Sequence, residues 1–352
     1  MGAPITETKK WQSAEYDMVI DVRSPSEFAD DHIPGAVSMP VMSDAERAEI
    51  GTVYKQRSAF LARKKGSALV ARNIADHLET KLHDMPPNFT PLIHCWRGGQ
   101  RSKAFAQICS EIGWQTYTLK GGYKSYRRDV LQGLEELPAQ LSFIVIAGRT
   151  GSGKTDILAG LADQGAQMLD LEELAQHRGS LLGRMVDRPQ PSQRMFESNL
   201  LAAIQNFDPG QPIYVESESS RVGDIQLPPV LWQKIITAPM ISIATSRTAR
   251  ATYLLSGYKQ LTEDLSDLQK LVTGMTHRHG HERTAIWQGL IEDKNWQNLA
   301  EDLLECHYDP AYDKSILRHD RPLLAEIEQI DCAPRTIKAT ASEILGIDNH
   351  LN

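Results

Sequence analysis

Short apolar runs alternate with segments of helical periodicity through the first 140 residues of the chain. Three of these runs have the length of strands: 17–22, 91–94 and 115–119. Apolar side chains recur at helical spacing in two segments between them: 67–83 and 102–112. The prolines at 86 and 87 end the first of these helices. Strands that alternate with helices in this order predict a parallel sheet.

A second set of strands begins after a polar, proline-containing linker at residues 135–141. The apolar runs of this second set are 142–147, 212–215 and 235–243. Residues 253–324 have a mostly helical pattern that is rich in Gln, Asp and His. We therefore predict two α/β domains, 1–136 and 137–352, the second with a helical C-terminal part.

The composition is ordinary for a globular chain of 352 residues, with 41% apolar and 24% charged residues. No run reaches the roughly 18 apolar residues of a membrane span, and the N-terminus lacks the apolar core of a secretion signal. We therefore expect a cytoplasmic protein with no membrane contact. The four cysteines form no C-x-x-C pair, which argues against structural zinc, so free thiols and no metal site are expected.

The charge is unevenly spread along the chain. The net charge is −7, but residues 1–140 carry 18 Lys and Arg against 17 Asp and Glu. A uniformly basic nucleic-acid binder is therefore excluded. Any contact with RNA must come from local basic patches, and the N-terminal half is favoured.

A complete phosphate-binding motif follows the strand predicted at 142–147. Its string GRTGSGKT fits G-x-x-x-x-G-K-[ST] and consists of Gly148, Arg149, Thr150, Gly151, Ser152, Gly153, Lys154 and Thr155. Backbone N–H groups of such a loop surround phosphate oxygens, and the helix N-terminus adds to the attraction. A nucleotide or any other diphosphate satisfies these donors, and the Thr155 hydroxyl is a ligand for Mg²⁺. Glu216, at a later strand end, is a Walker-B-like carboxylate.

The string His94-Cys95-Trp96-Arg97-Gly98-Gly99-Gln100-Arg101-Ser102 is the second motif that carries chemistry. Cys95 follows a strand, and a short glycine-containing loop leads to a helix start. Inward N–H groups, the helix dipole, Arg97 and Arg101 should favour the thiolate of Cys95. The same loop would hold an oxyanion, a persulfide or a perselenide, and the string also fits the H-C-x-x-G-x-x-R-S pattern of cysteine phosphatases.

Residues 21–28 (DVRSPSEF) and 32–36 (HIPGA) resemble the opening signature of rhodanese domains, so the surroundings favour a rhodanese-like fold for the cysteine loop. The loop is one residue longer than in simple sulfur-transferring rhodaneses. A rhodanese module followed by a P-loop resembles the tRNA 2-selenouridine synthases. Strings that extend this resemblance occur at 51–56, 95–102, 121–124, 170–172, 177–180, 216–219 and 308–310.

The resemblance implies a two-step modification of the wobble uridine of certain tRNAs. Geranyl diphosphate first alkylates the sulfur of 2-thiouridine, and selenium from selenophosphate then displaces the S-geranyl group. It implies Cys95 as selenium carrier, Arg97 and Arg101 as anion stabilisers and Lys154 as diphosphate clamp. No tightly bound cofactor is expected, and selenophosphate synthetase is a candidate partner. The alternative is a cysteine phosphatase or sulfurtransferase coupled to a P-loop NTPase or kinase.

The partner implied by the resemblance is the anticodon region of tRNA, so basic and aromatic residues near the cysteine motif are candidates to bind it. The basic candidates are Arg57, Lys64, Lys124, Arg127 and Arg128. The aromatic candidates to stack on a flipped base are Trp96, Tyr123 and Tyr126. Three histidines at 277, 279 and 281 have no Cys or carboxylate partners at fixed spacing, so we interpret them as a polar helix end.

Overall fold

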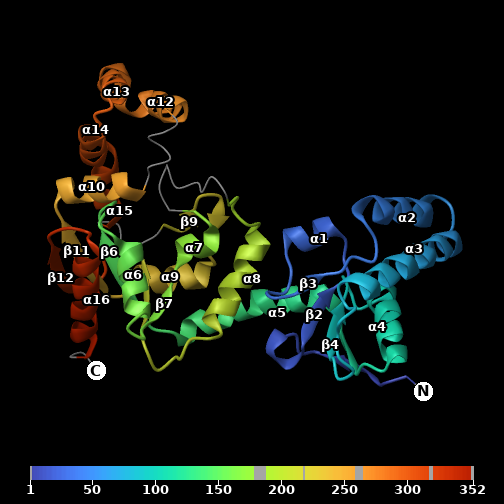
Figure 1. The fold of residues 1–352 in the computed structure, drawn as a ribbon. Coiled ribbons are helices and arrows are strands. Elements are labelled where there is room, and N and C mark those ends of the chain that lie inside the picture. The colour runs from blue at the N-terminus through green and yellow to red at the C-terminus, as the bar shows by residue number, and fades with distance from the viewer. Residues whose placement is uncertain (1, 178–187, 217–218, 258–264, 317–319, 350–352) are drawn as a thin grey trace. The chain divides into compact units, whose positions relative to one another are not determined.

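The computed structural model describes residues 2–177, 188–216, 219–257, 265–316 and 320–349 (Figure 1). Contacts along the chain divide it into two compact units. Unit 1 consists of Met1–Leu137, Leu174–Asn206 and Gly223–Pro228. Unit 2 consists of Pro138–Glu173, Phe207–Val222 and Pro229–Asn352. Among the described residues, no helix combines the length and apolar character required to span a membrane.

Unit 1 is built on a five-stranded parallel sheet. In spatial order the strands are β1 (Ile5–Thr8), β5 (Thr116–Leu119), β4 (Pro91–His94), β2 (Met18–Asp21) and β3 (Val37–Ser38). The central strands β4 and β2 are in register from Met18 opposite Pro91 to Asp21 opposite His94. Both strands therefore end together, and Cys95 follows at that edge. The parallel sheet predicted from the alternating pattern is confirmed.

The helices of unit 1 are α1 (Pro25–Asp30), α2 (Asp44–Gln56), α3 (Ala59–Thr80), α4 (Gln100–Ile112), α5 (Gly122–Glu136) and α8 (Gln193–Ile204). Helices α2 and α3 of unit 1 begin at serines whose side chains cap them. Ser43 accepts a hydrogen bond from the Glu46 N–H, and Ser58 accepts from the Phe60 and Leu61 N–H groups. A short 3₁₀ turn, η1, spans Ser13–Glu15.

The core of unit 1 lies between the sheet and helices α3 and α4. Ile20 and Ile93 from the sheet meet Ile74 of α3 and Phe105 of α4 in one buried cluster. Cys95 belongs to the same cluster, at its edge nearest the loop. The helix predicted at 67–83 is longer at its start, because α2 and α3 form a hairpin that the apolar pattern did not reveal.

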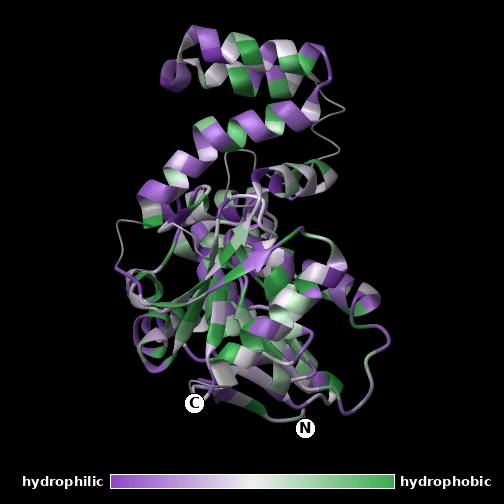
Figure 2. Cartoon of the chain, turned by 90° about the vertical axis from the view of Figure 1, so that its left-hand side faces the viewer, coloured by the Kyte–Doolittle hydropathy of each residue, from purple (hydrophilic) through white to green (hydrophobic). Residues whose placement is uncertain are grey.

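Unit 2 is built on a second five-stranded parallel sheet. In spatial order its strands are β12 (Leu323–Gln329), β11 (Met240–Thr245), β6 (Phe143–Gly148), β8 (Ile213–Glu216) and β7 (Gln167–Leu169). These strands are coloured largely as hydrophobic in Figure 2. Helices α6 (Lys154–Ala162) and α16 (Pro334–Asn349) pack against each other, and their apolar side chains meet the sheet in a core with Ile146 and Ile243.

The other elements within the described residues are helical apart from two short strands. They are η2 (Leu137–Gln140), α7 (Leu171–Ala175), β9 (Arg221–Val222), β10 (Ile225–Gln226), α9 (Pro229–Thr237), α10 (Arg247–Gly257), α12 (Leu265–Gly274), α13 (Thr276–Glu292), α14 (Trp296–Leu303), the π-helical turn η3 (Leu304–Tyr308) and α15 (Asp309–Ile316). Helices α12, α13 and α14 enclose a small core around Trp287. The strand predicted at 235–243 is wrong over its first part, because Leu231 and Ile235 are buried on one face of α9.

Helix α8 lies outside the predicted domain boundary. The sequence division assigned every residue after 136 to the second domain, whereas α8 packs on α5 in unit 1. A Cβ on Gly133 would lie 2.6 Å from Leu201, so α5 presents a glycine where α8 approaches. Helix α8 also contacts the N-terminal segment of unit 1, because the Ser198 hydroxyl donates to Asp31.

Candidate active site

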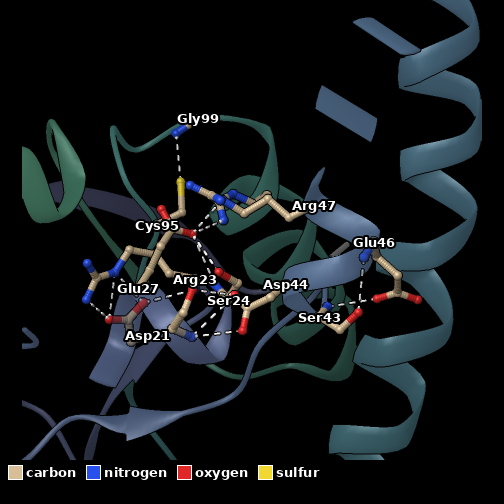
Figure 3. Close-up of polar contacts among 12 residues, drawn as sticks. Asp21, Arg23, Ser24, Glu27, Ser43, Asp44, Glu46, Arg47, Cys95 and Gly99 are labelled. Atoms are coloured by element: carbon tan, nitrogen blue, oxygen red, sulfur yellow. Dashed lines mark hydrogen bonds and ion pairs between the residues drawn. The ribbon is translucent and has the colours of Figure 1, made fainter. Parts of the chain in front are cut away.

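The Cys95 sulfur lies inside a loop that turns back on itself at the edge of the unit 1 sheet. The Gly99 N–H donates to Sγ over 3.2 Å (Figure 3). The Ser102 hydroxyl lies 3.2 Å from the same atom. Ser102 sits in the first turn of α4, so the helix N-terminus also faces the sulfur. Two polar groups and a helix N-terminus therefore surround the sulfur, and the role of Cys95 stays a prediction.

Cys95 is enclosed, with only 3% of its surface exposed. The proposed carrier role needs a thiol that meets its reagents, so this burial restricts how they arrive. A reagent must enter through the loop between Trp96 and Arg101, or the loop must open. A chalcogen atom bonded to Sγ would extend one bond beyond the sulfur.

The start of α5 packs closely against the backbone of the cysteine loop. The Tyr123 N–H donates to the Cys95 carbonyl over 2.8 Å, and the Lys124 N–H donates to the Trp96 carbonyl over 3.0 Å. Gly122 has φ +59°, and a Cβ there would lie 2.2 Å from the Cys95 carbonyl oxygen. Only glycine permits this approach, which explains the Gly121-Gly122 pair before α5.

The two loop arginines differ in their surroundings. Arg101 donates to Glu27 over 3.1 Å. Arg47 contacts the same carboxylate at 3.1 Å (Figure 3). Burial works against ionisation of Glu27, but Arg101, Ser24 and Arg47 outweigh it and hold the pKa of Glu27 below its ordinary value. Arg97 is exposed on the loop.

A pocket of about 380 Å³ adjoins the loop on the side of Arg101. Its lining residues are Ser26, Glu27, Asp30, Arg47, Trp96, Arg101 and Arg194. We call it the arginine pocket. The sequence motif identified Arg101 and Trp96, but it missed Arg47 and Arg194, which come from α2 and α8. Trp96 therefore remains a candidate to stack on a base.

A buried ionic network supports the strand ends beside Cys95. Arg23 contacts both oxygens of Asp21 and donates through Nη2 to the Asp31 carbonyl. Burial alone would raise the pKa of Asp21, but the hydrogen bonds and positive charge of Arg23 hold it below its ordinary value. Burial lowers the pKa of His94, so this imidazole is neutral at pH 7. Arg23 thus provides the positive charge that compensates Asp21.

Two of the aromatic candidates for base stacking are inside the protein. Tyr123 and Tyr126 are 2% and 0% exposed. The Tyr123 hydroxyl donates to Asp31 over 2.6 Å, and its ring lies under the Arg23 guanidinium. These tyrosines serve the core, and the interpretation of them as base-stacking residues is wrong in this structure.

The basic candidates for tRNA binding lie on two elements of unit 1. Arg57 is exposed in the turn between α2 and α3, and Lys64 is exposed in the second turn of α3. Lys124 and Arg128 are exposed on α5. Arg127 of α5 is 16% exposed and ion-paired to Glu197 of α8, so its charge is used within the fold.

The P-loop of unit 2 has the backbone that its motif predicts. Gly151 and Gly153 have φ +85° and +73°, and α6 begins directly afterwards. A Cβ on Gly148 would lie 2.5 Å from the Ser152 hydroxyl oxygen, so the strand end also requires glycine. The Lys154 ammonium donates to the Gly148 carbonyl over 3.0 Å and therefore lies across the loop.

A buried ion pair between α10 and α15 contacts the P-loop backbone. Arg250 of α10 makes two 2.8 Å bonds to Asp309 of α15 and donates to the Thr150 carbonyl over 3.1 Å. Arg149 donates to Asp313 over 2.9 and 3.1 Å, so its guanidinium is directed to α15. Its backbone remains part of the loop.

Next to Gly148 and Arg149 lies a larger pocket of about 880 Å³. Its lining includes apolar side chains at Ile243, Ala244 and Ile316, together with the carboxylates of Glu326 and Glu328. Glu216, the Walker-B-like residue, is buried at the end of β8, in register with Ile146 of β6. Residues 178–180 and 217–218 of the family strings lie outside the described residues.

The other cysteines differ chemically from a reactive thiolate. Burial raises the pKa of Cys109 to about 12 and that of Cys332 to about 11, and it also raises the pKa of Cys306. These thiols are therefore protonated at neutral pH and poorly nucleophilic. Among the histidines at 277–281, His279 forms a hydrogen bond through Nε2 to Nδ1 of His307, over 2.8 Å, which is not the arrangement of a metal cluster.

A cysteine loop at one sheet edge and a P-loop at the start of a second sheet define a rhodanese-like protein fused to a P-loop domain. Residues 5–129 match the rhodanese-like domain family, and residues 141–283 match the tRNA 2-selenouridine synthase AAA domain.

Curated relatives match along most of the chain. The tRNA 2-selenouridine synthase of Sulfurovum sp. (strain NBC37-1) is 33% identical over 87% of this chain and 90% of its own length. That of Shewanella frigidimarina is 31% identical over 84% of this chain and 87% of its own length. The chain belongs to the tRNA 2-selenouridine synthase family.

Proposed function

We propose that this protein converts 2-thiouridine at the wobble position of tRNA into 2-selenouridine through an S-geranyl intermediate. The observation that carries the proposal is the presence, in a chain of this family, of two separate anion-binding loops. One has a sulfur nucleophile at its centre, and the other has the backbone of a diphosphate site. Modification by two successive group transfers requires both kinds of loop.

In the first step, the thiouridine sulfur attacks the first carbon of geranyl diphosphate. A carbon–sulfur bond forms, the carbon–oxygen bond breaks, and the uridine N3 proton is released. The negative charge that develops on the leaving diphosphate is stabilised by the loop N–H groups and by Lys154. The 880 Å³ pocket beside Gly148 has room and apolar surface for the geranyl chain.

Mg²⁺ fits the chemistry of the P-loop. The Thr155 hydroxyl is exposed at the start of α6, and the Glu216 carboxylate ends the strand beside the loop. These are the hard oxygen ligands that Mg²⁺ prefers, and a bound ion would add positive charge near the diphosphate. Lys154 and the loop N–H groups provide the protein's own share of that charge.

In the second step, the Cys95 thiolate attacks the selenium of selenophosphate; a sulfur–selenium bond forms, the selenium–phosphorus bond breaks and phosphite leaves. The selenium on Cys95 then attacks C2 of the S-geranylated base, the carbon–sulfur bond at C2 breaks, and geranyl thiol leaves. An added thiol reductant cleaves the sulfur–selenium bond, which releases the 2-selenouridine and leaves Cys95 in a mixed disulfide that a second thiol reduces. The Gly99 N–H and the Ser102 hydroxyl stabilise the anion at the sulfur. Arg101 and Arg47 in the arginine pocket face the phosphate group of the donor. A selenophosphate synthetase is the proposed source of that donor.

The decisive experiment is mass spectrometry of wobble nucleosides after incubation with thiolated tRNA, geranyl diphosphate and selenophosphate. We expect Lys154→Ala to block geranylation, and Cys95→Ala to accumulate the S-geranyl nucleoside without selenium. Cys306→Ala, which removes a thiol outside both loops, is the matched control and should behave as the wild type. Normal selenouridine formation by both loop variants would refute the assigned roles.

The adduct on Cys95 separates the selenium carrier from a phosphatase-like nucleophile. After incubation with selenophosphate alone, the Cys95 peptide should gain selenium. A phosphoryl group instead of selenium would show attack on phosphorus and overturn the carrier role. Hydrolysis of p-nitrophenyl phosphate that is lost in Cys95→Ser would favour the phosphatase alternative, and rapid ATP turnover that is lost in Lys154→Ala would favour an NTPase.

A further inference from the structure

The hairpin of α2 and α3 carries a stretch of the sequence that is rich in positive charge and contains no acidic residue. Residues 50–75 contain six Lys and Arg and no Asp or Glu, in a chain whose net charge is −7. Lys65 pairs with Glu49, whereas Arg57, Arg63 and Lys64 make no ion pair with any residue that the structure describes. Their charge is therefore available to an outside partner.

Exposed aromatic side chains lie within this basic segment. Tyr54 is 60% exposed and Phe60 is 68% exposed. They are the aromatic members of the set of large, exposed apolar side chains among the described residues. An uncovered tyrosine and phenylalanine among free cations are unusual on the surface of a protein that has no partner.

The hairpin presents these residues on its open side. Helix α3 buries Ala62, Gly66, Val70 and Ile74 at every fourth position, and α2 buries none of its residues. A Cβ on Gly66 would lie 3.2 Å from Met42 and 3.6 Å from Ile50, so the glycine lets the start of α2 approach α3 closely. The opposite faces remain open to a partner.

We infer that this surface binds unpaired nucleotides of the tRNA next to the reacting base. We call it the hairpin patch and define it by Tyr54, Lys55, Arg57, Phe60, Arg63 and Lys64. Cations that neutralise phosphates and aromatic rings that stack on splayed bases are the two means by which proteins bind single-stranded RNA. The inference rests on the proposed function, which supplies the tRNA.

Helix α2 connects the hairpin patch to the cysteine loop. Arg47 in its first turn lines the arginine pocket beside Cys95. Tyr54 follows seven residues later, so it lies on the same face of α2 and about 10 Å further along the axis. A few nucleotides span that distance. RNA whose wobble base enters the arginine pocket would thus pass over the patch.

The charge of the patch disfavours a second copy of the chain as its occupant. A symmetric dimer through this surface would bring the same cations of both copies together. Like charges in an interface oppose association, whereas phosphates neutralise them. RNA is therefore the partner that the charges favour.

Binding of dye-labelled thiolated tRNA, followed by fluorescence anisotropy at several salt concentrations, tests the inference. Arg57→Ala/Lys64→Ala should weaken binding about tenfold and reduce the salt slope by about 1–2, because two phosphate contacts are lost. Tyr54→Ala/Phe60→Ala should weaken binding about tenfold or more with the slope unchanged, since stacking releases no counterions.

Matched controls remove the same types of side chain elsewhere. Arg335→Ala/Lys338→Ala removes two exposed cations of α16, and Leu131→Ala removes an exposed apolar side chain of α5. Both controls should bind tRNA as the wild type does. Circular dichroism and thermal unfolding of each variant should match the wild type, because the patch side chains support no core.

Failure of this inference differs from failure of the proposed function. If the wild type forms selenouridine and both patch variants bind tRNA normally, the inference is overturned and the function stands. If the wild type neither binds nor modifies thiolated tRNA, both are overturned. A dimer that Tyr54→Ala/Phe60→Ala converts to monomer with tRNA binding unchanged would assign the patch to a second copy instead.

Discussion

Replacing Gly122 by alanine should disrupt the cysteine loop while leaving the P-loop intact. The added Cβ would lie 2.2 Å from the Cys95 carbonyl oxygen and 2.5 Å from the Gly98 nitrogen. Both are backbone atoms, and a Cβ essentially never lies within 3.0 Å of such an atom, so the loop must move by about 1 Å. A positive φ costs an alanine about 1–2 kcal/mol, and overpacking adds about 1–3 kcal/mol.

The rate at which iodoacetamide alkylates Cys95 measures how readily the loop opens. The protein is labelled first, and the label is then quantified on the peptide that contains Cys95. Destabilising the closed loop by about 1.4 kcal/mol raises the population of the open loop tenfold. Cys95 should therefore be labelled at least ten times faster in Gly122→Ala than in the wild type. The same variant should accumulate the S-geranyl nucleoside, because selenium transfer depends on the loop and alkylation does not.

Gly113→Ala is the matched control for this substitution. Gly113 also has a positive φ, at +111°, but a Cβ there meets nothing within 4 Å. It carries the backbone strain without the collision, so it should label Cys95 as slowly as the wild type. Wild-type labelling and selenium transfer in Gly122→Ala would refute the reasoning, as would equally fast labelling in both variants.

Three further predictions follow from individual contacts. Ser102→Ala removes a hydroxyl from the cysteine sulfur and should slow its alkylation at pH 7 about tenfold, and an unchanged rate would contradict a thiolate stabilised by that contact. Asp309→Asn should lower the free energy of unfolding, measured in urea, by about 1–3 kcal/mol, whereas Asp313→Asn on the exposed pair should cost under about 1 kcal/mol; equal losses would argue against a buried brace. Burial lowers the pKa of His307 from 6.5 to about 4, so an unfolded chain binds the extra proton in this window and stability should fall as the pH drops from about 6.5 to about 4. His307→Gln should flatten that decline in thermal unfolding, and a decline as steep as the wild type's would exclude His307 as its cause.

Local patterns sufficed to predict the central strands of both sheets and both loops, but they missed the strands β1, β3, β7 and β12. The apolar runs that end at Asp21 and His94 are central strands, and the motif glycines Gly151 and Gly153 have the backbone angles a P-loop needs. These features depend on residues that are close in sequence, so spacing and side-chain type carry the necessary information.

The rest of the candidate site depends on contacts between distant residues. Arg47 meets Glu27 from another helix, and Arg194 joins the same pocket from a segment about 100 residues after Cys95. Neither arginine lies in a motif, so no spacing could identify it. The burial of Tyr123 was missed for the same reason, because its partner Asp31 lies 92 residues away.

The position of α8 has a consequence for how such a protein can be taken apart. The polypeptide passes between the units five times, and the Asp31 carboxylate, which is fully buried, accepts hydrogen bonds from Tyr123 before the first passage and Ser198 after the second. If the chain were cut after residue 137 and the rest removed, the buried Asp31 carboxylate would lose the hydrogen bond that Ser198 donates to one of its oxygens. Because the chain alternates between the two units, neither unit can be exchanged for a homologous one at a single fusion point.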